Sequence, residues 1–301
     1  MVEGGCENHV VFGGHLGVAG RSMLADARRA LDDPALSDAE RVHELRKAFK
    51  RWRAFLRLLA KPIGAPAAAL RRDGGALMRR VSPARDAQAA LDAIDDLAGG
   101  SALSPRILTT IRARLTALRD AAESASLTSQ LHAEIDRYLA RADDILATWP
   151  LAGIGFDAVA DGFAATYRRA RRLTPDNWRD ADPAHLHALR RRVIEHRHQM
   201  ELIAPLWPRA TKARSQDAQR LRHRLGACQD LSVLAGFVAP RQPLAAWRAR
   251  LMPLIAARRE RHVKNAARLA GRLFEDKPHA FRRRIAALST ESEARMNKAK
   301  L

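Results

Sequence analysis

The chain has few cysteines and aromatic residues, and it has no long hydrophobic run. Its two cysteines, Cys6 and Cys228, form no metal-binding or disulfide pattern, which fits a reducing compartment. No stretch of 18 apolar residues is present, so we expect no membrane span. The first 20 residues contain Glu3 and Glu7 and lack the basic start of a signal peptide. These absences predict a cytoplasmic protein with a flexible leader.

Alternating polar and apolar runs are also absent, so strands are not expected. Ala, Leu and Arg dominate, and charges interrupt the apolar residues every three or four positions, which is typical of helical bundles. Ser37 is a candidate N-cap, with Glu40 at the capping-box position. The sequence predicts an all-α fold whose helices cover residues 22–31, 37–60, 66–80, 84–97, 105–123, 127–148, 156–173, 183–207, 212–238, 243–274 and 278–296.

The net charge of +20 is carried almost entirely by arginine, because only eight lysines are present. Self-repulsion of this size favours a protein whose usual partner is a polyanion. Arginine presents a planar fork that contacts two phosphate oxygens at once. GC-rich codon usage is an alternative source of the arginine, but it does not explain the sign of the net charge.

One segment of the sequence occurs twice, 144 residues apart. Residues 42–47 (VHELRK) recur at 186–191 (LHALRR), and the block at 77–86 aligns with 221–230 at the same offset. Two blocks that share one offset indicate a duplication, with the halves meeting near Trp149-Pro150. The predicted organisation is a leader over 1–20 and two helical repeats over 21–150 and 151–301.

The first copy of the repeat predicts a helix with one basic face. On a helical wheel, Arg46, Lys47, Lys50 and Arg57 lie within about 60° of His43, and Arg53 lies at about 80°. A solvated face usually mixes acids with bases, whereas these like charges repel one another and would be stabilised by an anion at each 5.4 Å turn. The second copy keeps His187, Arg190, Arg191 and Arg197 but has Ile194 and Glu201 in place of Lys50 and Arg57.

Other interpretations of these residues remain open. Either basic face could be an ordinary solvated surface, and either histidine could be a helix cap or a core residue. A metal site is disfavoured because lysine and arginine follow His43 at the next helical turns. Catalysis on phosphoanhydrides would need carboxylates that hold magnesium, and the basic face has none.

With these motifs, the sequence resembles the CHAD family, the conserved histidine α-helical domain, over about residues 20–290. The resemblance rests on the two histidine motifs, on Arg85-Asp86 and Gln229-Asp230, and on the segment from Leu273 to Phe281. It implies two four-helix bundles related by a pseudo-twofold axis, with a basic groove or pore between them. It also implies binding of inorganic polyphosphate and, for some members, location at polyphosphate granules.

The resemblance implies a set of polyphosphate-binding residues and no catalytic residue, metal or cofactor. The set is His43, Arg46, Lys47, Lys50, Arg53, Arg57, His187, Arg190, Arg191 and Arg197, with Arg80 and Arg224 as weaker candidates. Arg28 and Arg172 are further candidates from the sequence itself, because they share the 144-residue offset. A triphosphatase domain, which some relatives carry, would need a Glu-x-Glu-x-Lys motif, and none occurs near the N-terminus. We therefore expect a non-catalytic polyphosphate-binding protein. Nucleic-acid binding is the alternative, although no known nucleic-acid-binding motif is present and aromatics are few.

Overall fold

The protein is all-helical in its computed structural model, which describes residues 4–81, 85–99, 103–123 and 127–299. No strand occurs among these residues, as the sequence predicts. The helices are α1 (Gly4–Asp32), α2 (Asp38–Leu58), α3 (Ala65–Arg80), α4 (Arg85–Ala98), α5 (Pro105–Glu123), α6 (Ser129–Ala147), α7 (Phe156–Arg172), α8 (Pro183–Ile203), α9 (Pro208–Phe237), α10 (Arg248–Leu273) and α11 (Pro278–Ala299). Two short 3₁₀ helices, η1 (Leu151–Gly153) and η2 (Ala245–Trp247), precede α7 and α10.

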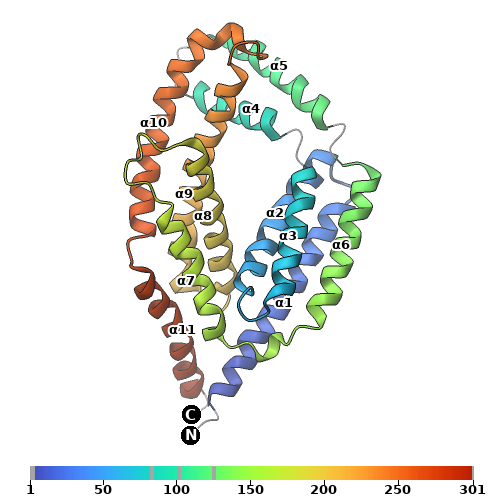
Figure 1. Cartoon of the computed structure of the whole chain (residues 1–301), viewed down its shortest axis with the longest axis vertical. Coiled ribbons are helices and arrows are strands. Elements are labelled where there is room, and N and C mark those ends of the chain that lie inside the picture. Colours follow the sequence, from blue (N-terminus) through green and yellow to red (C-terminus); the bar gives the residue numbers. More distant parts are fainter. Residues whose placement is uncertain (1–3, 82–84, 100–102, 124–126, 300–301) are drawn as a thin grey trace.

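The helices form two upright groups joined across one end (Figure 1). Helices α1, α2, α3 and α6 make one group, and α7 to α11 make the other. Helices α4 and α5 leave the first group: α4 packs against α9 and α5 packs against α4, at the end farthest from the chain termini. The two groups also touch directly, because α2 packs against α8. A strict division into two four-helix bundles stays a prediction.

Most predicted helix ends lie within a few residues of the observed ones, because proline, glycine and capping residues mark them. Ser37 caps α2 by accepting a hydrogen bond from the Glu40 backbone, and Glu40 reaches back to the Ser37 backbone, so the predicted capping box is confirmed. The start of α1 differs. The expected leader is wrong from Gly4 onward, because the helix begins there and buries Phe12 and Leu16 at 3% and 0% exposure.

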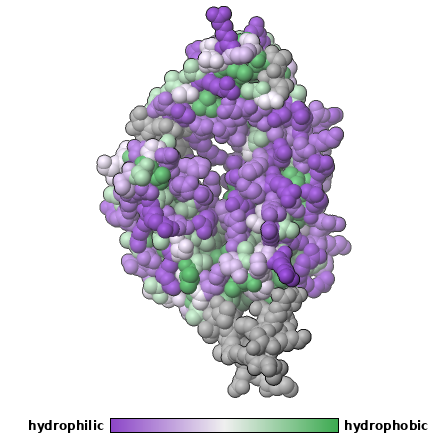
Figure 2. Space-filling model, turned by 180° about the vertical axis from the view of Figure 1, so that it is seen from behind, coloured by the Kyte–Doolittle hydropathy of each residue, from purple (hydrophilic) through white to green (hydrophobic). Residues whose placement is uncertain are grey.

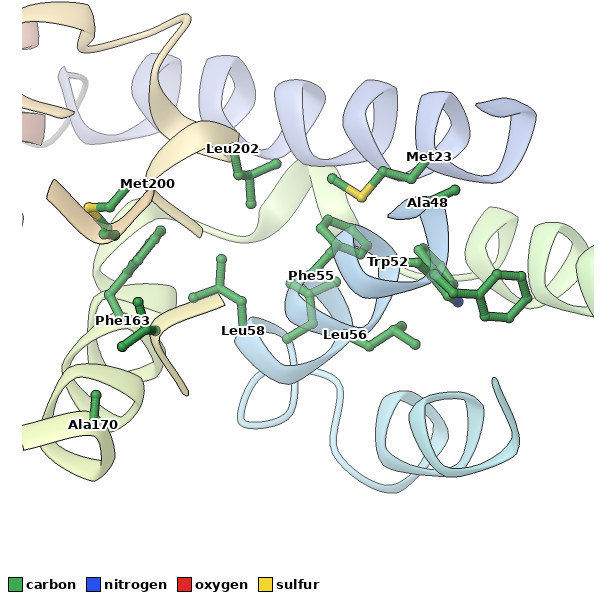
Figure 3. Close-up of a cluster of buried hydrophobic side chains, with 14 of the residues drawn as sticks. Met23, Ala48, Trp52, Phe55, Leu56, Leu58, Phe163, Ala170, Met200 and Leu202 are labelled. Carbon is green, nitrogen blue, oxygen red and sulfur yellow. The ribbon is translucent and has the colours of Figure 1, made fainter. Parts of the chain in front are cut away.

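One hydrophobic core runs through both groups (Figure 3). Trp52, Phe55 and Leu58 of α2 point into the same interior as Phe163 of α7 and Leu202 of α8. A second, smaller core joins α4 and α5 to the ends of α9 and α10. The two halves therefore share buried surface.

The order of helices in the second half repeats that of the first at the 144-residue offset. At this offset, α8 corresponds to α2 and α10 corresponds to α5. Most of α7 corresponds to the second part of α1. Helix α9 covers the counterparts of both α3 and α4, so one long helix stands where the first half has two. This order agrees with the predicted duplication, whose common origin stays a prediction.

Candidate anion-binding site

The candidate site is built where α2 packs against α8. Arg57 Nε of α2 lies 3.0 Å from Glu195 Oε1 of α8, so the two side chains form an ion pair. The angle at Nε does not make this contact a hydrogen bond. One turn away along α8, Gln199 donates a hydrogen bond to the backbone oxygen of Ala54, which is buried. These contacts fix the crossing, so the basic faces of the two repeated motifs meet there.

At this crossing, five arginine and lysine side chains of α2, α8 and α9 whose pKa values burial lowers have no ion-pair partner among the described residues. They are Arg46, Lys50, Arg53, Arg190 and Arg222. Most other cations nearby are paired, for example Lys47 with Glu44 at 3.0 Å and Arg197 with Glu201 at 2.7 Å. Unpaired charges that are partly removed from water are costly, and an anion would relieve that cost.

The electrostatic strain shows in the pKa values of these groups. Burial, followed by the like charges of Arg85 and Arg190, lowers the pKa of Arg46. Burial and four surrounding arginines lower the pKa of Lys50 to about 8. Water still reaches Lys50, which screens part of this repulsion. The depressed values identify the place where negative charge would be most stabilising.

Glycines on the neighbouring helices give two of these arginines room to lie flat. A Cβ atom at Gly75 of α3 would lie 3.3 Å from the guanidinium carbon of Arg53. A Cβ at Gly226 of α9 would lie 3.3 Å from a terminal nitrogen of Arg190. The Nε atoms of both arginines are buried and have no hydrogen-bond partner in the described part of the chain. Each guanidinium is thus held against a helix backbone, with its terminal nitrogens left for a ligand.

A pocket of about 690 Å³ opens beside the crossing, between α1, α2, α8 and α9; we call it the first pocket. His43, Lys47, Lys50 and Arg197 line it, so four of the predicted residues come together there. Its further polar lining residues include His15, Arg51, His198, Glu201 and Arg222. From behind, hydrophilic residues dominate the surface and border a hollow between the two sides of the molecule (Figure 2).

The two repeated histidines have different surroundings. His43 is exposed and lines the first pocket. His187 is half-buried, and its Nδ1 atom has no hydrogen-bond partner among the described residues. Burial and the nearby Arg191, Arg85 and Arg190 lower the pKa of His187. An anion placed beside these arginines would favour the protonated form of His187.

Seven of the predicted binding residues neither line the first pocket nor belong to the five unpaired cations. Three of them, Arg57, His187 and Arg191, belong to the two crossing helices, and the other four lie elsewhere. Arg28 and Arg80 form ion pairs with Asp143 and Glu134 of α6, respectively. Arg172 is the exposed last residue of α7. Arg224 lines a separate recess between α9 and α10. These four residues share the arginine-rich composition of the site but not its location.

Sequence reasoning missed two basic residues at the crossing. Arg222 of α9 contributes to the repulsion on Lys50, and its counterpart at the 144-residue offset is Met78, so the repeat gave no signal for it. Arg85 of α4 faces Arg46, Lys50 and Arg190, because α4 packs against α9. The pattern around Arg85 was visible in the sequence, but only the fold brings α4 to the crossing.

The site has the chemistry of an anion receptor. Within the described ranges, no group of three or more histidine, cysteine, aspartate or glutamate side chains could hold a metal ion. In the same ranges, no helix is long and apolar enough to cross a membrane.

The fold and the site define an all-helical protein with an excess of unpaired cations where two repeated motifs cross. The chain belongs to the CHAD domain family, because the model of that family matches residues 19–239. No functionally curated protein matches the chain in sequence.

Two solved structures share the fold at low sequence identity. The CHAD domain from the plant Ricinus communis has a TM-score of 0.58 at 17% identity, with 92% of each chain covered. PptA from Streptomyces chartreusis has a TM-score of 0.59 at 19% identity, covering 88% of this chain and 99% of that one.

Proposed function

We propose that this protein binds inorganic polyphosphate, without catalysis, through the basic crossing of α2 and α8. Membership of the CHAD family, which is associated with polyphosphate binding, supports the ligand class. The observation that carries the proposal is the group of five cations that have no ion-pair partner among the described residues. They lie on facing helices, so a linear anion could contact several of them at once.

Polyphosphate suits this arrangement better than an isolated anion does. The cations of α2 follow one another along the helix, from Arg46 through Lys50 and Arg53 to Arg57. A helical turn rises about 5.4 Å, so a chain that carries a negative charge on every phosphate can contact each turn. Location at polyphosphate granules in the cytoplasm would follow from such binding and forms part of the proposal.

The proposal is tested by the affinity for long-chain polyphosphate, with duplex DNA and heparin as competitors, at about 0.15 M salt. We expect polyphosphate to be preferred, and the variant Lys47→Glu/Lys50→Glu to lose most of the binding. The matched control is Arg72→Glu/Arg114→Glu. It reverses two exposed charges that do not line the first pocket. Equal binding of all three polyanions would instead indicate a general polyanion-binding protein.

The absence of catalysis is tested separately. The protein would be incubated with polyphosphate and magnesium, and released orthophosphate would be measured. We expect no release above a protein-free control. Release that disappears in His43→Ala would contradict the non-catalytic proposal.

A further inference from the structure

A second basic pocket, of about 850 Å³, lies between the end of α2, α3, α7 and the start of α11. We call it the second pocket, and none of its lining residues is shared with the first. Six cations line it, against the single carboxylate of Asp161: Arg57, Lys61, Arg71, Arg168, Arg169 and Arg282.

Half of these cations already have an ion-pair partner. Asp161 accepts hydrogen bonds from Lys61 and, at 2.6 Å, from Arg282, and these bonds hold the pKa of its carboxyl at about 2. Arg57 is paired with Glu195. The other three, Arg71, Arg168 and Arg169, have no ion-pair partner in the described part of the chain. The second pocket therefore retains three positive charges for a ligand.

The second pocket also contains a buried hydroxyl without a partner. Thr166 lines the pocket and is only 1% exposed, and its Oγ1 atom has no hydrogen-bond partner among the described residues. A buried hydroxyl that bonds nothing is unusual, because the loss of its bonds to water is not compensated. A phosphate oxygen is an acceptor that this hydroxyl could serve.

The start of α11 borders the same pocket, although its first residue, Pro278, has no backbone N–H. Pro278 and His279 lie in its first turn and line the second pocket. The first backbone N–H groups of a helix have no partner within the helix, and the helix dipole favours negative charge there. Arginine side chains, a hydroxyl and a helix start thus converge from α3, α7 and α11.

The second pocket is the counterpart of the first at the 144-residue offset. Thr166 corresponds to Ser22 and Leu58 to Leu202, and each of these residues lines its own pocket. The charge differs at one equivalent position: the first pocket has Glu201, and the second pocket has its counterpart, Arg57. The two pockets therefore occupy equivalent places in the halves, and the second has the larger share of positive charge.

We propose that the second pocket is a separate binding site for a compact phosphate anion of the size of inorganic tripolyphosphate. Arg71, Arg168 and Arg169 would contact the phosphate oxygens, and the Thr166 hydroxyl would donate a hydrogen bond to one of them. The proposal goes beyond the binding of a long chain at the crossing and does not depend on it.

The test counts the tripolyphosphate ions bound per chain by isothermal titration calorimetry at about 0.15 M salt. The variant Arg71→Ala/Arg169→Ala should bind one ion fewer than the wild-type protein. The control Arg72→Ala/Arg114→Ala removes two exposed arginines outside both pockets and should keep the wild-type number. An unchanged number in Arg71→Ala/Arg169→Ala would overturn the proposal.

A conservative variant guards against a general loss of folding. Thr166→Val keeps the shape of the side chain and removes only the hydroxyl, so the melting temperature should not fall. Its affinity at the second pocket should fall by roughly 10-fold or more, the effect of one hydrogen bond to a charged group. Unchanged affinity in this variant would refute the role of the hydroxyl.

The same measurement separates this proposal from the proposed function. Lys47→Glu/Lys50→Glu should lose long-chain polyphosphate yet still bind one tripolyphosphate ion, which Arg71→Ala/Arg169→Ala removes. If the protein shows no preference for polyphosphate over DNA but still loses one tripolyphosphate ion in Arg71→Ala/Arg169→Ala, only the proposed function fails. If tripolyphosphate binding disappears entirely in Lys47→Glu/Lys50→Glu, the second pocket is not a site.

Discussion

Arg190 is where the stability of the fold and ligand binding should oppose each other most clearly. Its guanidinium lies against Gly226, has no ion-pair partner among the described residues and faces Arg85 and Arg222. The Arg190→Met variant would keep most of the side-chain volume and remove the charge. Replacing a partly buried charge by an apolar side chain of similar size is neutral or stabilising by about 1 to 4 kcal/mol. For a chain of this length, each 1 kcal/mol corresponds to roughly 2 °C in melting temperature.

Binding should change in the opposite direction. A hydrogen bond to a charged group contributes about 1.5 to 3 kcal/mol, so Arg190→Met should weaken polyphosphate binding by roughly 10-fold or more. A ligand at 100 times its Kd stabilises the folded state by about 2.7 kcal/mol, and a tenfold weaker variant would gain about 1.4 kcal/mol at the same concentration. The advantage in melting temperature that the variant has without ligand should therefore shrink or reverse when polyphosphate is added.

The assay is thermal unfolding with and without long-chain polyphosphate, followed by circular dichroism. Arg114→Met removes an exposed charge from α5 and serves as the control, for which we expect less than about 0.5 kcal/mol of change. A lower melting temperature for ligand-free Arg190→Met, together with unchanged binding, would refute the reasoning, because Arg190 would then be a structural residue.

Three further predictions concern single groups. At pH 8, binding of polyphosphate should take up about half a proton, because the pKa of Lys50, lowered to about 8, would return toward 10.5. Calorimetry in buffers of different ionisation enthalpy measures this uptake. The Lys50→Met variant should show none. Burial lowers the pKa of His196 to about 3, below its unfolded value of about 6.5. The contribution of neutral His196 to stability is therefore present above pH 6.5 and is lost as the pH falls. By pH 4.5, urea unfolding should show that the wild-type protein has lost about 2 to 3 kcal/mol more of its unfolding free energy than His196→Phe. Gly75→Ala should keep the stability of the fold and weaken binding, because only the flexible end of Arg53 must move. Gly74→Ala should instead lower the free energy of unfolding by roughly 1 to 3 kcal/mol, because its Cβ would lie 2.7 Å from the Tyr138 oxygen. Thermal unfolding measures both.

The fold was largely predictable because its helices are short enough for local signals to mark both ends. Proline at the start of α5, α8 and α11 and the capping box of α2 are read from neighbouring residues alone. Pro208 instead predicts the end of the preceding helix, so the predicted start of the next helix, at Lys212, lies four residues after the observed start of α9. The start of α1 was missed because its glycines weaken the helical signal, while burial against other helices stabilises it. At Gly13, for example, an added Cβ would lie 2.2 Å from the Leu151 backbone oxygen.

The candidate site was predictable only as far as the repeat extends. The basic face of α2 follows from helical periodicity, so Arg46, Lys50 and Arg53 were found. The location of Arg222 and Arg85 depends on how α9 and α4 pack, and no pattern within either helix contains that information. The ion pairs of Arg28 and Arg80 were not predictable for a related reason, because their acidic partners lie on α6, far away in sequence.

The offset also explains why the two pockets differ although the halves share one arrangement. Arg57 and Glu195 form an ion pair across the crossing, and their counterparts at the offset are Glu201 and Arg51, which both line the first pocket. The signs are exchanged at both equivalent positions, so in each pair α2 supplies the base and α8 supplies the acid. Glu201 accepts hydrogen bonds from Arg197 and His198 of its own helix instead. The charge at the second copy is therefore partly neutralised within α8, whereas Lys50 and Arg53 of α2 remain available. A duplicated fold thus leaves three of the five unpaired cations on α2, because in α8 Ile194 stands in place of Lys50 and the counterpart of Arg53, Arg197, is paired with Glu201.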